Sequence, residues 1–590
     1  QIIKAQTTLD SLRNDHIDPG KKKHWFWAEF FRYKGLIGEI MISSFVANAL
    51  AVAVALFSLQ VYDRVIPHQG IPTLWVLAIG AFVAIGLEVL LKISRARLMD
   101  GAGRRIELAV QDILYNRLLG MQSDKRPMGA AGTFAAMREF GAVREFFTAS
   151  AVGSVMDIPF ILLFLALVAS IGGPVVWVLV AGAVLMLLPS YLMQRRMMEL
   201  TREAQGASAK SSRLLQETIF EIETLKTQRG EDRFRRLWRE LNGLSSVTSG
   251  AQRQIASNLT FWSQGVQQAT YVGAVIAGTF LVFAGNMTVG SIIAIGILTG
   301  RTLGPLTQLA GTMARWSNVK TALDGLDVVE EAPQDIEEGR TYLRRDQIEG
   351  RYDLREVLYK YDEDSPAVVD VKAIQIDPGE HIAVLGTNGA GKTTLLKTMA
   401  GLYAPTQGRV MLDGVDLAQL DARDVRRGVG YLSQDVRLFS GTLRDNLNLN
   451  GLETEDARLL AALDFAGLGQ FVRGHHKGLD MDIREGGEGL SVGQRQSLGW
   501  ARLWLQDPQV VLLDEPTAAL DQTLEHALIG RMQEWLRGRT ALIATHRVPI
   551  MQLTERTFIM QQGRLVVDGP RETVLAHLTQ TPDSKKEARA

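Results

Sequence analysis

Six long apolar runs in the first 320 residues limit the fold of this 590-residue chain more than any other feature. A helix that crosses the hydrocarbon core of a bilayer needs about 20 predominantly apolar residues. A single run of this kind is also typical of a buried core helix, but six in one half of a chain indicate a membrane domain. We therefore expect six spans, at 37–59, 71–93, 152–171, 173–193, 261–284 and 289–310.

The loops between these runs indicate how the chain is oriented in a lipid bilayer. Nine Lys or Arg residues lie between the second and third spans and twelve between the fourth and fifth, whereas the three opposite loops contain only Arg64. Because Lys and Arg accumulate on the cytoplasmic side of a membrane, both long loops and the C-terminal half are predicted to be cytoplasmic. The basic and aromatic residues 21–27 predict an interfacial elbow before the first span.

A glycine-rich loop in the second half of the chain predicts phosphate binding. It follows the apolar run 381–385 and precedes a helix-like stretch at 394–399, which is the order of strand, loop and helix that a P-loop requires. Its glycines let backbone N–H groups face phosphate, its lysine can reach the β- and γ-phosphate oxygens, and its threonine hydroxyl suits Mg²⁺. The alternative is a turn that merely joins strand to helix. The predicted nucleotide-binding residues here are Gly386, Thr387, Asn388, Gly389, Ala390, Gly391, Lys392, Thr393 and Thr394.

A second apolar run, 510–513, ends in two acidic residues, Asp514 and Glu515. Buried parallel strands open onto a site at their carboxyl ends. We expect Asp514 to hold the Mg²⁺ shell and Glu515 to act as general base on the attacking water.

Between these two regions, residues 490–496 read Leu-Ser-Val-Gly-Gln-Arg-Gln, a run that resembles the LSGGQ signature of ABC transporter ATPases. Val492 departs from it, because a glycine is usual there. Four more residues match short motifs of the family in order and spacing: the A-loop aromatic Tyr361, the Q-loop Gln434, the D-loop Asp521 and the switch His546.

This resemblance implies an ATPase that uses ATP and Mg²⁺, with Glu515 and His546 as catalytic residues. It places Gln434 with Thr393 and Asp514 at the metal, and Tyr361 against the adenine. It also implies a homodimer, in which the signature residues of one chain meet the nucleotide held by the other. The resemblance thus adds Ser491, Gly493, Gln494 and Asp521 to the ATP site.

Residues of the membrane half and of the loop before the signature indicate which branch of the ABC transporter family the chain resembles. Residues 59–67, 157–160 and 484–489 are similar to type I secretion ATPases, closest to exporters of RTX toxins and large adhesins. That branch implies a protein of the bacterial inner membrane whose cargo is a large unfolded protein with a C-terminal secretion signal. Its implied partners are a periplasmic adaptor and an outer-membrane channel. Two alternatives are an exporter of lipid or drug-like small molecules and a non-transporting regulator that uses ATP binding as a switch.

Together these observations predict a membrane all-α domain with six helices, followed by an α/β P-loop NTPase domain of the ABC type. The expected parts are an N-terminal remnant with the elbow at 1–30, the transmembrane domain at 31–320, a linker at 321–345, the nucleotide-binding domain at 346–580 and a flexible tail at 581–590. Relatives often begin with a peptidase-like domain; its removal and its natural absence are both left open.

Composition excludes several other chemistries. The chain contains no cysteine, which excludes disulfides, thiolate metal sites and cysteine nucleophiles. Its formal net charge of zero gives no support for nucleic-acid binding.

Charged residues inside predicted spans are costly and usually functional. We expect Asp157 and Arg301 to face a central cavity or to pair with each other, with snorkelling to the bilayer edge as the alternative. The cytoplasmic segments 131–147 and 215–227 are either solvated helices or contacts with the ATPase. The resemblance to ABC exporters, which have coupling helices at these positions, favours contact, with the loop 485–489 as the partner.

Overall fold

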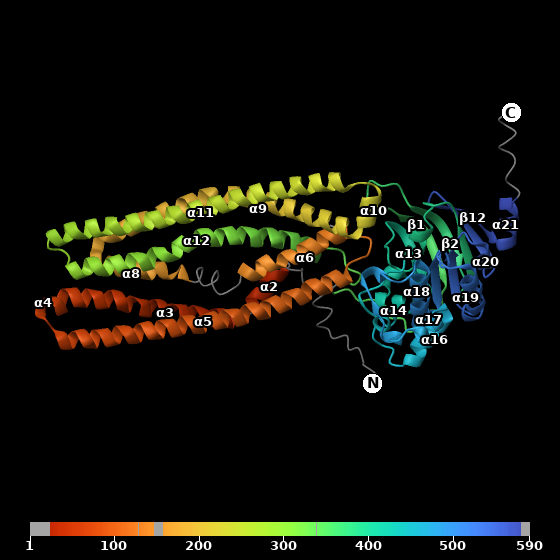
Figure 1. Ribbon diagram of the computed structural model, residues 1–590, viewed down its shortest axis with the longest axis horizontal. Coiled ribbons are helices and arrows are strands. Elements are labelled where there is room, and N and C mark those ends of the chain that lie inside the picture. The colour runs from red at the N-terminus through yellow and green to blue at the C-terminus, as the bar shows by residue number, and fades with distance from the viewer. Residues whose placement is uncertain (1–23, 33, 128, 147–156, 338, 580–590) are drawn as a thin grey trace, which may run out of the picture. The chain divides into compact units, whose positions relative to one another are not determined.

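The computed structural model describes residues 24–32, 34–127, 129–146, 157–337 and 339–579, which form two compact units (Figure 1). Unit 1 comprises the described residues up to Leu119 and those within Arg126–Ala332. Unit 2 comprises Gly120–Lys125 and the described residues from Pro333 onward. A six-residue piece of the first half of the sequence therefore belongs to the second unit.

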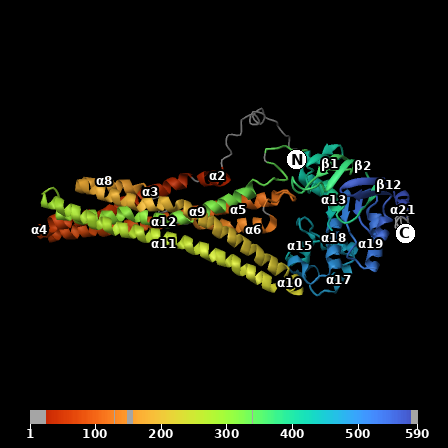
Figure 2. The same cartoon turned by 90° about the horizontal axis from the view of Figure 1, so that it is seen from above.

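All secondary-structure elements in the described part of unit 1 are helices, and the long ones run side by side in both views (Figures 1 and 2). A π-helical turn at Val61–Val65 and a 3₁₀ turn at Gly173–Val175 connect some of them. The helices are α2 (Trp25–Arg32), α3 (Lys34–Gln60), α4 (Ile66–His68), α5 (Ile71–Gly120), α6 (Gly129–Phe146), α8 (Phe160–Gly172), α9 (Val176–Phe220), α10 (Ile222–Thr227), α11 (Glu231–Phe283) and α12 (Val289–Glu330).

Five helical stretches in the described ranges are long and apolar enough to cross a membrane. One of them, Phe160–Phe220, contains the predicted fourth span and residues 160–171 of the predicted third, because α8 and α9 are joined through the short turn at Gly173. Gly173 has a φ of 47°. The chain reverses direction between α8 and α9 (Figure 1). Residues 152–156 of the predicted third span lie outside the described residues. The stretches are Gly38–His68, Ile71–Gly120, Phe160–Phe220, Glu231–Phe283 and Val289–Gln308.

Several helices are much longer than a bilayer requires. α5 has 50 residues and α11 has 53, which at 1.5 Å per residue is more than twice the roughly 30 Å hydrocarbon core. The parts beyond the apolar windows carry the positive charges of the predicted cytoplasmic loops. These loops are thus largely continuations of the spans.

The predicted linker at 321–345 is wrong over its first ten residues, because α12 continues to Glu330. Its Leu323 and Leu326 are buried in a cluster with Leu114 of α5 and Phe26 of the elbow helix α2. Apolar residues at helical spacing thus bury one face of this stretch in unit 1. The elbow is fixed to the same helix, since the Trp25 indole N–H donates to Asp327 at 2.8 Å.

The two segments expected to contact the ATPase, 131–147 and 215–227, differ in how far their apolar side chains are buried. In α6, Phe140 and Val143 are buried in the core of unit 1, whereas residue 147 lies outside the described residues. At the end of α9, Ile219 and Phe220 are more than 60% exposed within the chain, and Ile222 of α10 is exposed as well. Contact of these segments with the ATPase stays a prediction.

Asp157 and Arg301 do not pair with each other, and that expectation is wrong. Asp157 Oδ1 accepts a hydrogen bond from Arg95 at 2.7 Å and another from Asn48 at 3.1 Å. Arg301 donates to Glu88 at 3.0 Å, and the Glu88 side chain is only 7% exposed. Both partners lie on α5, where one helix supplies an arginine and an acid about two turns apart. The sequence around Asp157 and Arg301 does not show which helix packs beside each residue, so it could not predict that α5 supplies both partners.

Reversing one charge of the Arg95–Asp157 pair should destabilise unit 1. Asp157→Arg places two cations together at a site where both side chains are at most 22% exposed, and breaking a largely buried ion pair costs about 3 kcal/mol. The double variant Arg95→Asp/Asp157→Arg restores opposite charges and should recover most of the loss. Thermal unfolding of the purified protein measures both, with Asp100→Arg on the exposed side of α5 as the control. A double variant no better than either single variant would contradict the pair.

Unit 2 is an α/β structure with three sheets. Its strands are β1 (Tyr352–Tyr359), β2 (Val369–Ile376), β3 (His381–Leu385), β4 (Gln407–Leu412), β5 (Val415–Asp416), β6 (Val429–Leu432), β7 (Gly441–Thr442), β8 (Asp482–Ile483), β9 (Val510–Asp514), β10 (Thr540–Ala544), β11 (Arg556–Gln561) and β12 (Arg564–Pro570). Its helices are α13 (Lys392–Met399), α14 (Ala422–Gly428), α15 (Leu443–Leu447), α16 (Asp456–Ala466), α17 (Gly469–Gly474), α18 (Val492–Gln506), α19 (Gln522–Trp535), α20 (Val548–Met551) and α21 (Arg571–Thr579).

The largest sheet has the strand order β12-β11-β3-β10-β9-β6, and all its pairings are parallel except that of β11 with β12. Its two faces have different coverings. Val511 and Leu513 of β9 lie in one apolar cluster with α16, α18 and α19. Val510 and Leu512 lie in another, with α13 and the antiparallel sheet β2-β1-β4-β5. Burial on both faces explains why the central strands are continuous apolar runs.

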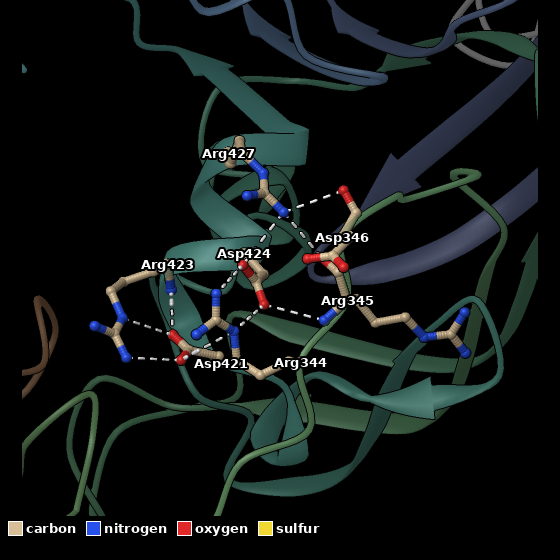
Figure 3. Close-up of polar contacts among 7 residues, drawn as sticks. All are labelled: Arg344, Arg345, Asp346, Asp421, Arg423, Asp424 and Arg427. Carbon is tan, nitrogen blue, oxygen red and sulfur yellow. Dashed lines mark hydrogen bonds and ion pairs between the residues drawn. The ribbon is translucent and has the colours of Figure 1, made fainter. Parts of the chain in front are cut away.

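An arginine–aspartate cluster ties the start of unit 2 to α14 (Figure 3). Asp424 Oδ2 accepts hydrogen bonds from Arg344 Nε at 2.8 Å and from the Arg345 backbone N–H at 3.0 Å. Asp421 accepts from the Arg423 guanidinium at 2.9 Å, and this hydrogen bond chiefly lowers the pKa of Asp421. Burial opposes the charge on Asp424, but the hydrogen bonds from Arg344 and Arg345 outweigh it and lower the pKa of that carboxyl.

We expect the Asp424→Asn variant to be about 1 kcal/mol less stable than the wild type at pH 7, since the arginine partners are largely exposed. A carboxyl with a lowered folded-state pKa stabilises the fold above its unfolded pKa of about 4 and loses that effect as the pH falls through the folded value. The difference between the two proteins should therefore shrink below about pH 4. Melting temperatures across pH measure it, with the exposed Asp364→Asn as control; a constant difference at all pH values would contradict this origin.

Candidate functional site

The predicted site residues gather at one edge of the large sheet. The P-loop follows β3 and His546 follows β10. Asp514 is the last residue of β9, Glu515 comes directly after it, and Gln434 follows β6. These four strands are consecutive neighbours and parallel. Because the carboxyl ends of parallel strands meet at the same edge, residues up to 160 positions apart in sequence form one site.

The P-loop backbone needs glycine at two tight positions. Gly386 has a φ of 154°, and a Cβ there would lie 2.4 Å from the Met560 carbonyl oxygen. Gly391 has a φ of 97° and caps α13, and a Cβ there would lie 2.3 Å from the Val368 carbonyl oxygen. At Gly389, by contrast, a Cβ would meet nothing within 4 Å. The loop is therefore packed on one side and open on the other, as a phosphate cradle requires.

Lys392 lies at the centre of this cradle. Its Nζ donates to the Gly386 carbonyl at 2.7 Å and lies 3.2 Å from His546 Nε2. Burial lowers the pKa of Lys392, while the charges of Glu515 and Asp514 act in the opposite direction. The ammonium thus has carbonyl and imidazole partners that a phosphate oxygen can replace.

The residues at the predicted metal position fit a cation in part. Asp514 is 3% exposed, and burial raises its pKa although the Thr393 hydroxyl hydrogen-bonds to it and Lys397 lies nearby. A buried carboxylate next to a hydroxyl is the kind of oxygen pair that Mg²⁺ accepts. Gln434 is exposed, and its side chain has no hydrogen-bond partner among the described residues. The structure therefore brings together Thr393 and Asp514 but not Gln434.

Glu515 is held in a backbone conformation that is rare for its residue type. Its φ is 47°, its N–H donates to the Ala544 carbonyl at 2.8 Å, and its carbonyl accepts from Gln496 Nε2 at 2.8 Å. Its carboxylate lies 3.5 Å from His546 Nε2. Strain of this kind persists only where the surroundings hold it, and it occurs often at catalytic positions.

The signature residues begin α18. Ser491 caps this helix, with its hydroxyl accepting from the Gln494 N–H at 3.1 Å while Gln494 Oε1 accepts from the Ser491 N–H at 2.9 Å. The close backbone approach is at Gly493, where a Cβ would lie 2.8 Å from the Ala519 carbonyl oxygen. Val492 is 58% exposed. The departure from the family pattern therefore causes no steric conflict inside this chain.

Two other predicted residues occupy the ends of the site. The Tyr361 ring is 52% exposed, and its hydroxyl lies 3.2 Å from Thr394 Oγ1 at the start of α13. Asp521 caps α19 by accepting from the Leu524 N–H at 2.9 Å.

Three residues that sequence reasoning missed support the catalytic strand end. Gln496 bonds both to Glu515 and to the Ala519 N–H, the latter at 2.9 Å. Arg547 donates to Glu525 at 2.8 Å and to the Ala518 carbonyl at 2.9 Å. Gln496 and Arg547 lie within one or two residues of recognised motifs, which was the available signal; no sequence signal indicated Glu525.

Comparisons with known proteins agree with this geometry. Residues 37–306 match the family described as ABC transporter transmembrane region, and residues 370–518 match the family described as ABC transporter. The chain is similar to the toxin RTX-I translocation ATP-binding protein of Actinobacillus pleuropneumoniae, with 30% identity over 567 residues that cover 94% of this chain and 78% of that protein. It is also similar to the alpha-hemolysin translocation ATP-binding protein HlyB of Escherichia coli, with 28% identity over 567 residues and the same coverage.

A solved structure has the same fold. The structure of a bacterial Atm1-family ABC exporter with ATP bound matches with a TM-score of 0.80, covering 93% of this chain and 99% of that chain at 18% identity. The expected fold class, a helical membrane domain followed by an ABC ATPase domain, is confirmed.

Proposed function

This chain belongs to the ABC transporter family, and on that premise we propose that it is the ATP-driven exporter of a type I secretion system in the bacterial inner membrane. Its cargo would be a large unfolded protein of the RTX toxin or adhesin type. The likeness to toxin translocation proteins carries this proposal, because it covers 94% of the chain and therefore includes the membrane unit. The ATPase motifs alone do not separate a protein exporter from an exporter of lipids or drug-like molecules.

In the proposed reaction, the P-loop N–H groups and Lys392 bind the β- and γ-phosphates of ATP, and Tyr361 stacks on the adenine. Thr393, Asp514 and Gln434 would hold Mg²⁺, which when bound neutralises charge on the phosphate oxygens. Gln434 would have to turn toward Thr393 and Asp514, and its exposure leaves it free to do so.

Glu515 would accept the proton of the attacking water. His546 lies 3.5 Å from that carboxylate and 3.2 Å from Lys392, so it is placed between the base and the phosphate-binding ammonium. The fixed backbone at Glu515 keeps the carboxylate oriented at the mouth of the cradle.

The dimer is a further part of the proposal. Ser491, Gly493, Gln494 and Asp521 would complete the site of a second copy. The exposure of Ser491 and Val492 at the start of α18 supports this, since an exposed helix N-terminus is a favourable place for phosphate. Two identical copies supply two complete sites. The remaining proposed partners are the lipid bilayer, a periplasmic adaptor, an outer-membrane channel and a cargo with a C-terminal secretion signal.

Export by cells carrying Glu515→Gln tests the proposed function. Cells with the wild-type protein should release a large protein into the medium, and cells with the variant should retain it, because binding without turnover cannot drive repeated transport. Normal release by the variant would overturn the proposal. Loss of lipid flipping in liposomes, with protein release unchanged, would support the small-molecule alternative instead.

A further inference from the structure

A short segment far from the ATPase motifs in sequence contacts the aromatic residues beside the candidate adenine site. Gly120–Lys125 belongs to unit 2, although 207 residues, Arg126–Ala332, separate it from the rest of that unit. The Gly120 carbonyl accepts from the Asp335 N–H at 2.7 Å, and the Gln122 N–H donates to the Pro333 carbonyl at 2.9 Å. Met121 forms an antiparallel bridge with Gln334.

The segment lies close to the chain that it pairs with. A Cβ on Gly120 would lie 2.6 Å from the oxygen at the end of the Gln334 side chain. With hydrogen bonds on both sides of the bridge, the segment is a small two-stranded pairing that fixes the residues after it. Asp124 lies in the same segment, two residues after Gln122.

Asp124 reaches the buried ring of Tyr359. The Tyr359 hydroxyl donates to Asp124 Oδ2 at 3.3 Å, and the tyrosine is 2% exposed. Burial raises the pKa of Tyr359, and the charge of Asp124 raises it further, so the phenol remains a donor at any working pH. Asp124 Oδ1 is buried without a hydrogen-bond partner among the described residues. This hydrogen bond therefore ties Tyr359 to the segment Gly120–Lys125.

Tyr359 in turn packs against Tyr361, the residue proposed to stack on adenine. Its ring meets Tyr361 edge to face, with centroids 5.4 Å apart and planes at 86°. Tyr403 stacks on Tyr359 at 5.2 Å and 16° and also meets Tyr361 edge to face, with centroids 6.2 Å apart. Lys397 lies over the Tyr403 ring at 5.1 Å. Tyr361 itself is half exposed and is anchored by only one polar contact, to Thr394. The buried ring beneath it thus limits the directions in which it can face.

We propose that Asp124 and Tyr359 are positioning residues for ATP binding, which hold the Tyr361 ring ready to stack on adenine. The Asp124–Tyr359 hydrogen bond fixes Tyr359, and the edge-to-face contact passes that orientation to Tyr361. A ring that is already oriented loses less conformational entropy when the base binds. This inference rests on the proposed stacking role of Tyr361.

The test uses the purified full-length protein and steady-state ATP hydrolysis. Asp124→Ala and Tyr359→Phe should each raise KM for ATP about three- to tenfold with kcat within about twofold, because a single hydrogen bond is lost away from the reacting phosphate. Asp124→Asn keeps an oxygen that accepts from the phenol and should restore most of the affinity. The double variant should be no worse than either single variant, because both remove the same bond.

Two controls separate positioning from general damage. Inhibition by inorganic tripolyphosphate, which has no base to stack, should be unchanged in all variants. Asp362→Asn removes an exposed carboxylate next to Tyr361 without touching Tyr359 and should leave KM unchanged. Weaker tripolyphosphate inhibition or a lower kcat in Asp124→Ala would overturn the inference in favour of a structural role.

A Tyr361→Ala variant distinguishes failure of this inference from failure of its premise. If Tyr361→Ala leaves KM unchanged, the stacking role itself is wrong. If Tyr361→Ala raises KM but Asp124→Ala does not, only the positioning role is wrong. Both results come from ATP hydrolysis without a transported protein. A failure of the export proposal would therefore leave them unchanged.

Discussion

Glu515→Gln is expected to lower the rate of ATP hydrolysis by about 100- to 10,000-fold while nucleotide still binds. The amide has nearly the same shape as the carboxylate but does not accept a proton from water at neutral pH. The backbone contacts that hold residue 515, to Ala544 and Gln496, do not involve the side chain. Binding should therefore remain within a few-fold of the wild type, and only turnover should be lost.

The measurement is phosphate release by the purified protein in lipid nanodiscs, together with the affinity for a fluorescent ATP analogue. Glu534→Gln is the matched control, since Glu534 is an exposed acid on α19 with no side-chain partner among the described residues. A Glu515→Gln protein that hydrolyses ATP at a third or more of the wild-type rate would remove Glu515 from the catalytic role.

Two variants that are each inactive as homodimers, one changed in the P-loop and one in the signature, should recover ATP hydrolysis when one copy of each forms a mixed dimer. Lys392→Ala removes the cation of the phosphate cradle, and Ser491→Arg places a bulky cation at the cap of α18. Each homodimer should lose about 100- to 1,000-fold in rate, as expected for loss of a phosphate-stabilising group. In a mixed dimer, one site carries both changes, but the other is built from the intact Lys392 of one copy and the intact Ser491 of the other.

Coexpression with two different affinity tags, followed by purification through both, isolates the mixed dimer. If the two sites act independently, we expect about half of the wild-type rate, because one of two symmetric sites is intact. The control is a doubly tagged dimer of two Lys392→Ala copies, which should stay inactive. Absence of recovery in the mixed dimer would contradict a site shared between two chains, or would mean that both sites must work together; a wild-type copy paired with Lys392→Ala separates these two results.

The residues of the nucleotide site were predictable because they belong to short local motifs. A P-loop needs glycine where the backbone turns, lysine next to it and a strand before it, and all three are adjacent in sequence. Six apolar runs and the distribution of Lys and Arg likewise predicted a membrane domain without any knowledge of packing.

The sequence by itself therefore determined the chemistry of the ATP site and the membrane character of the first half. It also indicated that the acidic site residues follow a buried parallel strand. The tertiary structure alone decided which charges meet, with Arg95 against Asp157 and Glu88 against Arg301, and where α12 ends. It alone placed Gly120–Lys125 in the second unit and Asp124 on Tyr359. The physical reason is that motifs and periodicity are properties of neighbours in sequence, whereas ion pairs and ring contacts depend on which surfaces the folded chain brings within a few ångströms.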